Sequence, residues 1–99
     1  ECFGPIAGIY RVDSPEEAIT VANNCEYGLA AAIFTRNIPL ARNIAHQLES
    51  GACHINSATV KDDPAMPFGG FKSSGYGRFG SDACVDEFSE VSWITVSPT

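Results

Sequence analysis

One apolar run near the middle of the chain constrains the fold more than any other feature. Residues 27–35 read YGLAAAIFT, with no charged side chain among them. A continuous apolar run of this length is typical of a strand that is covered on both faces, as in a parallel sheet flanked by helices. We therefore expect a buried strand here, with a helix before it and another after it.

The sequence before this run predicts a helix with a well-defined start. Ser14 can cap the helix, Pro15 suits its first position, and Glu17 stands where the partner of a capping box belongs. Apolar residues at helical spacing continue the pattern. We expect this helix to end at about Asn24.

The sequence after the run predicts a second helix. Asn37 is a suitable first residue, Leu40, Ile44 and Leu48 keep helical spacing, and Gly51 is expected to stop the helix. Shorter patterns predict the remaining elements. They are strands at 4–12, 52–56 and 91–96, and a short helix capped by Ser81 and running to about Glu90.

The order strand, helix, strand, helix, strand predicts an α/β fold with parallel βαβαβ connections. Two features indicate a piece of a larger body. A sheet of three parallel strands leaves open edges and a bare face. The polar stretch 57–80 is also longer than most loops of a compact domain, and such loops are usually functional or docked on another part of a protein.

Charge and hydropathy exclude some classes of function. The net charge is −6 and the six basic residues are scattered, which disfavours a nucleic-acid partner. No apolar run approaches the roughly 20 residues of a membrane span, so we expect no membrane partner. His46 and His54 have no Ser, Cys or carboxylate at suggestive spacing, so neither a catalytic triad nor a metal site is predicted.

The four cysteines, Cys2, Cys25, Cys53 and Cys84, form no C-x-x-C pair, which argues against a zinc ribbon or a thioredoxin-type site. Their even number permits disulfides. However, the apolar runs suffice for a core, whereas small disulfide-bonded domains usually lack one. Reduced thiols in a cytoplasmic protein are the favoured interpretation.

A glycine-rich stretch at 69–78, GGFKSSGYGR, permits a phosphate-binding interpretation, because glycines expose backbone N–H groups and Lys72 could add charge. The stretch lacks the G-x-x-x-x-G-K-[ST] spacing and does not link a strand directly to a helix. A small phosphate-binding α/β module therefore stays open as a weak alternative.

Several separated motifs carry a family likeness. E-x-F-G-P at the start, NNCEYGLAAAIFT, LESGACHIN and MPFGGFKSSGYGRFG follow one another in an order and spacing that resemble the C-terminal part of aldehyde dehydrogenases. The resemblance covers essentially all of the chain. It implies a fragment that begins at a cofactor-contacting residue, with the nucleotide-binding domain, the nucleophilic cysteine and the glutamate base upstream.

The resemblance implies three cofactor contacts and an NAD or NADP cofactor. The Glu1 carboxylate would accept hydrogen bonds from the two hydroxyls of the nicotinamide ribose, which matches an acceptor-only group to a vicinal diol. Phe3 would pack beside the nicotinamide, and Leu29 would contact the same end of the cofactor. The residues that distinguish NAD from NADP lie upstream in the family.

The resemblance also implies a substrate tunnel. Phe68 would line it near the aldehyde, Ala58 and Val60 would form its wall, and Asn56 would hydrogen-bond nearby backbone. None of the cysteines matches the family's nucleophile motif, so no residue of this chain is assigned a catalytic role. Phe79 replaces an acidic residue found in many members, and the motifs look closest to the branch of salicylaldehyde- and vanillin-type dehydrogenases, which act on aromatic aldehydes.

The resemblance finally implies two parts of the chain and a partner. Residues 1–90 would belong to the catalytic domain, and residues 91–99 would form a C-terminal strand that pairs across subunits of a dimer or tetramer. Such a protein is an oxidoreductase that converts an aldehyde to a carboxylic acid, although the 99-residue chain alone would be inactive. The alternative is a non-catalytic α/β module for oligomerisation or interaction.

Overall fold

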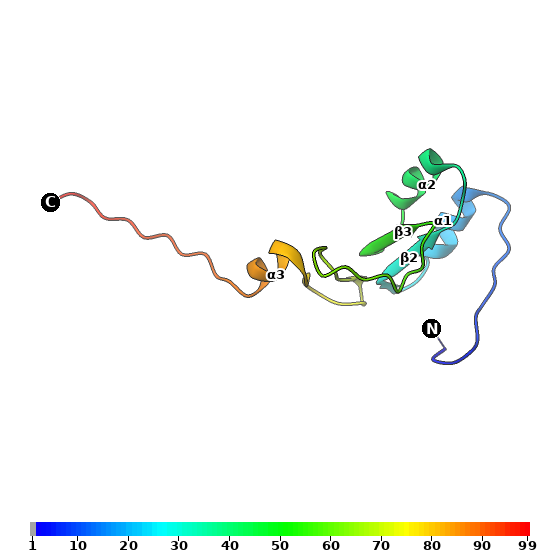
Figure 1. The fold of residues 1–99 in the computed structure, drawn as a ribbon, viewed down its shortest axis with the longest axis horizontal. Coiled ribbons are helices and arrows are strands. Elements are labelled where there is room, and N and C mark those ends of the chain that lie inside the picture. Colours follow the sequence, from blue (N-terminus) through cyan, green and yellow to red (C-terminus); the bar gives the residue numbers. More distant parts are fainter. Residues whose placement is uncertain (1) are drawn as a thin grey trace.

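The computed structural model describes residues 2–99, and these form a centre of helices and paired strands with two extended ends (Figure 1). The radius of gyration is 18.5 Å and the principal extents are 72 × 33 × 24 Å. A compact domain of this length has a radius of gyration of about 13 Å. The chain therefore does not close on itself as an independent globule.

The first helix, α1 (Pro15–Asn23), begins as its capping signals predict. The Ser14 Oγ accepts a hydrogen bond of 3.1 Å from the N–H of Glu17, and the Glu17 carboxylate accepts one of 2.8 Å from the N–H of Asp13. The first bond satisfies a backbone donor that the first turn of a helix leaves without a partner, and the second ties the preceding residue to that turn. The prediction of this helix is confirmed at both ends, to within a residue.

The central apolar run divides into two short strands with different partners. The first, β1 (Tyr27–Gly28), pairs antiparallel with β4 (Phe71–Lys72). The second, β2 (Ala30–Ile33), pairs parallel with β3 (Ala52–Ile55), in the register Ala30↔Ala52 to Ile33↔Ile55. The parallel crossover is confirmed, but the run is not one strand, because its partner changes at Leu29.

The second helix, α2 (Ile38–Ala45), packs along β3 and forms the crossover from β2 to β3. Its start is as predicted, since the Asn37 Oδ1 accepts a hydrogen bond of 3.0 Å from the N–H of Leu40. It ends earlier than expected, at Ala45 rather than at Gly51. The chain from His46 to Gly51 makes turns that bring Glu49 and Gly51 to the centre.

The side chain of Asn56 continues the pairing of β2 and β3 beyond the last paired residues. Its Oδ1 accepts from the N–H of Thr35 and its Nδ2 donates to the Thr35 carbonyl, both at 2.9 Å. Asn56 has a φ of 56°, a left-handed conformation that asparagine tolerates better than most residues. The predicted structural role of Asn56 as a partner of backbone groups is confirmed.

The glycine-rich segment folds as a tight turn against the centre. Phe68 and Phe79 form an antiparallel bridge, and the Arg78 guanidinium donates to the carbonyls of Gly70 and Gly77 at 3.1 and 2.7 Å. A Cβ on Gly51 would overlap the carbonyl oxygen of Gly69, so only glycine allows this approach. The last helix, α3 (Ser81–Glu87), follows; Gly80 is its cap, and Ser81 is its first residue rather than the predicted cap.

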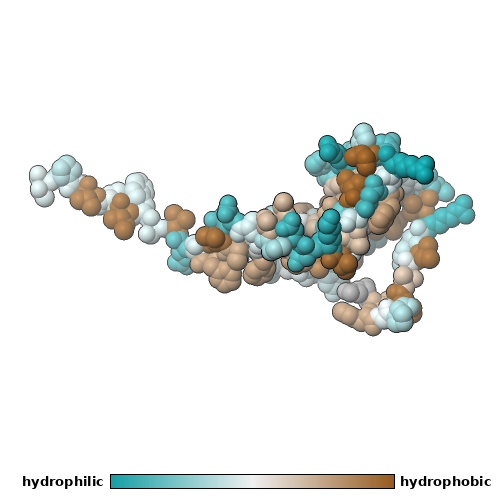
Figure 2. Space-filling view, in the orientation of Figure 1, coloured by the Kyte–Doolittle hydropathy of each residue, from teal (hydrophilic) through white to brown (hydrophobic). Residues whose placement is uncertain are grey.

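The two ends of the chain contain no helix or strand within residues 2–13 and 88–99. The predictions of strands at Gly4–Val12 and at Val91–Val96 are therefore wrong for this single chain. Their large side chains are exposed, with Ile9 at 94% and Trp93 at 90%, and Figure 2 shows apolar residues along both ends. A strand needs a partner for its backbone groups, and neither end has one among the described residues.

Candidate functional site

Two cavities share two lining residues, Leu29 and Ala30, which we name the shared wall. The first, which we name the Phe3 cavity, has a volume of about 590 Å³. The second, the Phe68 cavity, has a volume of about 520 Å³. Both volumes lie in the range of small-molecule sites. The wall is the point at which the chain passes from β1 to β2.

The Phe3 cavity contains two of the three residues expected to contact a cofactor. Phe3 comes from the extended N-terminal segment, and Leu29 comes from the wall. The remaining expected residue, Glu1, lies outside the residues that the structure describes. Cys25 and Ser74 also line this cavity, and the sequence pattern did not single them out as contacts. Both are small polar side chains near the end of β1.

Phe3 has a φ of 44° and is 93% exposed. A left-handed conformation is unfavourable for a residue with a bulky side chain. The ring therefore projects from a constrained turn, directly before the glycine and proline of the opening motif.

The Phe68 cavity contains two of the three residues expected to line a substrate tunnel. Phe68 and Val60 line it, with Met66 and Pro67 adding apolar surface. Ala58 is exposed and is absent from the lining, so the structure does not bring it together with the other two. Because Leu29 belongs to both cavities, it connects the two groups of predicted residues.

The floor of the Phe68 cavity comes from β3, which contributes Cys53 and His54. Burial raises the pKa of the Cys53 thiol above its usual range, because a low-dielectric surrounding disfavours the thiolate. A reactive cysteine instead needs a lowered pKa. Cys53 therefore has the properties of a structural thiol. All four cysteines are free thiols in the structure.

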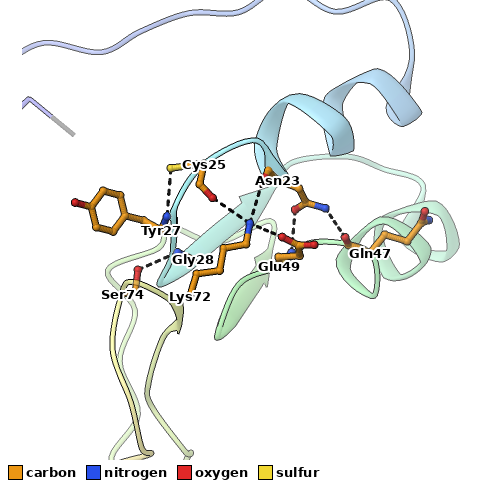
Figure 3. Close-up of polar contacts among 8 residues, drawn as sticks. All are labelled: Asn23, Cys25, Tyr27, Gly28, Gln47, Glu49, Lys72 and Ser74. Atoms are coloured by element: carbon orange, nitrogen blue, oxygen red, sulfur yellow. Dashed lines mark hydrogen bonds and ion pairs between the residues drawn. The ribbon is translucent and has the colours of Figure 1, made fainter.

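A polar network joins three segments beside the Phe3 cavity (Figure 3). The Lys72 Nζ donates to the carbonyls of Asn23 and Cys25 at 2.8 and 3.1 Å and forms an ion pair with the Glu49 carboxylate. An ammonium group has three donors, and these three acceptors match them. This arrangement does not support the alternative in which Lys72 binds a phosphate.

Sequence reasoning did not find this network. Its members are Asn23, Cys25, Glu49 and Lys72, which come from three separated stretches of the sequence. Nothing local to Glu49 or Lys72 indicates the other. The one available signal was a lysine within a glycine-rich turn, which is also compatible with a solvated side chain.

Within residues 2–99, no three His, Cys, Asp or Glu side chains gather as ligands of a metal ion. None of the helices in this part of the chain is long and apolar enough to cross a membrane.

The chain is similar to known enzymes over nearly its whole length. It is 50% identical over 96 residues to a vanillin dehydrogenase from Pseudomonas sp. (strain HR199 / DSM 7063), an alignment that covers 97% of this chain and 20% of the relative. It is 47% identical over 97 residues to the NAD(+) benzaldehyde dehydrogenase of Pseudomonas putida, again covering 97% of this chain and 20% of the relative.

A solved structure has the same fold. The salicylaldehyde dehydrogenase of Pseudomonas putida G7, complexed with salicylaldehyde, matches with a TM-score of 0.94 and 43% identity, covering 99% of this chain and 20% of that one. The chain thus spans about a fifth of the length of the curated relatives it matches.

The family model for the aldehyde dehydrogenase family matches residues 1–94. The family resemblance of the sequence motifs is therefore confirmed, as is a mixed α/β segment with a parallel sheet that forms a portion of the family's fold. The chain belongs to the aldehyde dehydrogenase family.

Proposed function

We propose that the protein carrying this chain is an NAD(P)-dependent oxidoreductase that oxidises an aromatic aldehyde to the carboxylic acid. In this proposal the chain forms the wall between the nicotinamide end of the cofactor and the aldehyde. The observation that carries it is the position of Leu29, which lines both the Phe3 cavity and the Phe68 cavity. Two ligands that react together must come within about 3–3.5 Å of each other, so a residue that borders both cavities lies where the two binding sites adjoin.

The Phe3 cavity fits the nicotinamide end of a dinucleotide. It has a volume of about 590 Å³ and is lined by two aromatic rings, two leucines and several polar groups. A flat ring packs well against Phe3 and Leu29, while polar groups at the edge suit its amide. Glu1 is proposed to bind the ribose hydroxyls. When bound, the nicotinamide supplies the hydride acceptor, and NAD and NADP both remain candidates.

The Phe68 cavity suits an aromatic aldehyde. Phe68 and Met66 offer ring and thioether surfaces for stacking, and Val60 closes the side of the cavity. The names of the relatives support the substrate class, since they are vanillin, benzaldehyde and salicylaldehyde dehydrogenases. Ala58 remains a proposed wall residue, although here it lies outside the lining.

The residues of this chain bind and orient, and none of them is proposed as a nucleophile or base. Leu29 and Phe68 are hydrophobic groups that exclude water from the reacting centre. Excluding water there would protect an acyl group on the upstream nucleophilic cysteine from premature hydrolysis.

We also propose a division of the chain into residues 1–90, part of the catalytic domain, and residues 91–99, an oligomerisation strand. The exposed apolar side chains of Val91, Trp93 and Ile94 support this. An unpaired extended segment gains backbone hydrogen bonds when it joins the sheet edge of another subunit. A dimer or tetramer in the cytoplasm is the proposed form.

The test is an assay of the purified whole protein that carries this chain, using benzaldehyde, salicylaldehyde or vanillin with NAD or NADP. We expect formation of the reduced cofactor and of the carboxylic acid. Phe68→Ala should raise the KM for the aromatic aldehyde roughly tenfold, because a stacked ring is lost. Phe3→Ala should raise the KM for the cofactor instead.

Phe34→Ala is the matched control, because Phe34 is exposed and lies outside both cavities. Its kinetic constants should match those of the wild type. A protein that oxidises none of these aldehydes with either cofactor would overturn the proposal and favour a non-catalytic interaction module.

A further inference from the structure

Lys72 occupies a position that its backbone conformation does not favour. It has a φ of 52°, in the left-handed region where a glycine would sit without strain. The neighbouring sequence is rich in glycine, so the segment readily supplies that residue type. A residue keeps an unfavourable backbone conformation only when its contacts compensate for the strain. For Lys72 these are the contacts of its side chain.

The contacts of Lys72 join three segments that lie apart in the sequence. Its Nζ reaches the carbonyls of Asn23 and Cys25, at the end of α1 and in the turn that follows, and the carboxylate of Glu49, between α2 and β3. The Asn23 side chain completes the link, since its Oδ1 accepts from the N–H of Glu49 at 2.9 Å and its Nδ2 donates to the Gln47 carbonyl at 2.8 Å (Figure 3).

This link holds the strand that leads into the shared wall. Tyr27 pairs with Lys72 in the β1–β4 register, and the N–H of Gly28 donates to the Ser74 Oγ at 2.9 Å. The carbonyl of Gly28 accepts from the N–H of Gly51 at 3.0 Å, and that of Leu29 accepts from the N–H of Ala52 at 3.1 Å. Leu29 is therefore fixed between the Lys72 segment on one side and β3 on the other.

We propose that Lys72 and Glu49 are a positioning pair that sets Leu29 between the two cavities, and thereby the approach of aldehyde to cofactor. This inference rests on the proposed function. The Lys72 side chain is 28% exposed and that of Glu49 is 53% exposed, so the ion pair itself contributes little to stability. Its effect is expected in the geometry of binding.

The test compares Lys72→Met and Glu49→Gln in the whole protein. Lys72→Met removes the ammonium and keeps the apolar stem. We expect the KM for both cofactor and aldehyde to rise on the order of tenfold, since small displacements of binding groups cost up to about 10²-fold. Glu49→Gln keeps an oxygen acceptor, so its effect should be roughly two- to threefold.

Glu26→Gln is the matched control. Glu26 lies next to β1, and its carboxylate makes no hydrogen bond or ion pair with residues 2–99. Its kinetic constants should be unchanged. A merely structural role for Lys72 would lower the fraction of active enzyme, and hence kcat, while leaving both KM values unchanged. That result, measured with active-site titration, would overturn the positioning role.

The amide of Gly28 gives a readout that does not depend on activity. Hydrogen exchange at Gly28 should be faster in Lys72→Met, because the Gly28 N–H loses its fixed position opposite Ser74. If the wild type oxidises aldehydes but Lys72→Met changes neither KM nor this exchange, the positioning role is wrong and the proposed function stands. If the wild type oxidises no aldehyde, the proposed function itself fails.

Discussion

The centre and the extended ends of this chain differ in whether their backbone N–H and C=O groups have hydrogen-bond partners. In the centre, β2 and β3 pair over four residues each, and Asn56 extends the pairing with its side chain. At the ends, residues 2–13 and 88–99 form no strand, although their sequences favour strands as strongly as that of β2. The difference shows that a sequence that favours a strand forms one only where another strand is present to pair with it.

The largest effect that separates the two regions is expected from adding one methyl group. Gly51→Ala places a Cβ against the Gly69 carbonyl oxygen, a backbone atom that cannot move aside as a side chain can. We expect the free energy of unfolding to fall by about 3 kcal/mol, at the upper end of overpacking costs. Denaturant unfolding of the whole protein measures it.

Gly8→Ala is the matched change in an extended end, where the added Cβ would meet only the movable ring of Tyr10. It should shift the unfolding free energy by less than about 0.5 kcal/mol. Equal changes in the free energy of unfolding for the Gly51 and Gly8 variants would contradict the difference between the centre and the extended end.

The next effect concerns the asparagine that extends the parallel pair. Asn56→Ala removes two hydrogen bonds to Thr35 and leaves an alanine at a φ of 56°. We expect a loss of about 2 kcal/mol in unfolding free energy. Asn24→Ala is the control, because the Asn24 side chain has no hydrogen bond within residues 2–99. No difference between the two variants would contradict the role of Asn56.

The extended C-terminal end should matter for assembly instead of for local stability. Trp93→Ala removes the largest apolar group of residues 91–96, which is 90% exposed in this chain. Association should weaken on the order of tenfold, as is common for an aromatic side chain at the centre of an interface. Light scattering over a dilution series measures it, with Ser97→Ala as control. An unchanged dissociation curve would argue that this end does not pair between subunits.

The smallest effect distinguishes thiols of the two regions by their reactivity. Burial raises the pKa of Cys53, so little of this thiol is ionised at neutral pH, whereas Cys25 is exposed to a reagent. Cys25 should react first with a thiol reagent, as followed by mass spectrometry. The stability from the protonated Cys53 is fully present below the usual thiol pKa, about 8.5, and is lost as pH rises through the raised value.

The local elements were predictable because their signals lie within a few residues. Ser14, Pro15 and Glu17 determine the start of α1, and Asn37 determines that of α2. The division of the central run at Leu29 was not predictable, because it depends on β4, which lies more than a helix and a strand further along the chain. The strands expected at both ends are absent for a related reason, because a strand needs a partner and neither end has one among the described residues.

The candidate site was predictable only through its motifs. Phe3, Leu29, Val60 and Phe68 line the two cavities and Ala58 does not, while their contacts with a cofactor or a substrate stay predictions. The Lys72–Glu49 pair could not be predicted, since charge patterning over short spacings carries no information about residues brought together by a crossover. Its partners become visible only when the turns after α1 and α2 are placed side by side.

Under the proposed function, Leu29 would also limit how the enzyme can be redesigned. A substitution of Leu29 that widens the Phe68 cavity for a bulkier substrate also changes the lining of the Phe3 cavity. Substrate range and cofactor affinity are therefore not independent variables at this position. A directed-evolution library that varies Leu29 should be screened for both properties at once, and substrate range alone is better changed at Val60 or Met66.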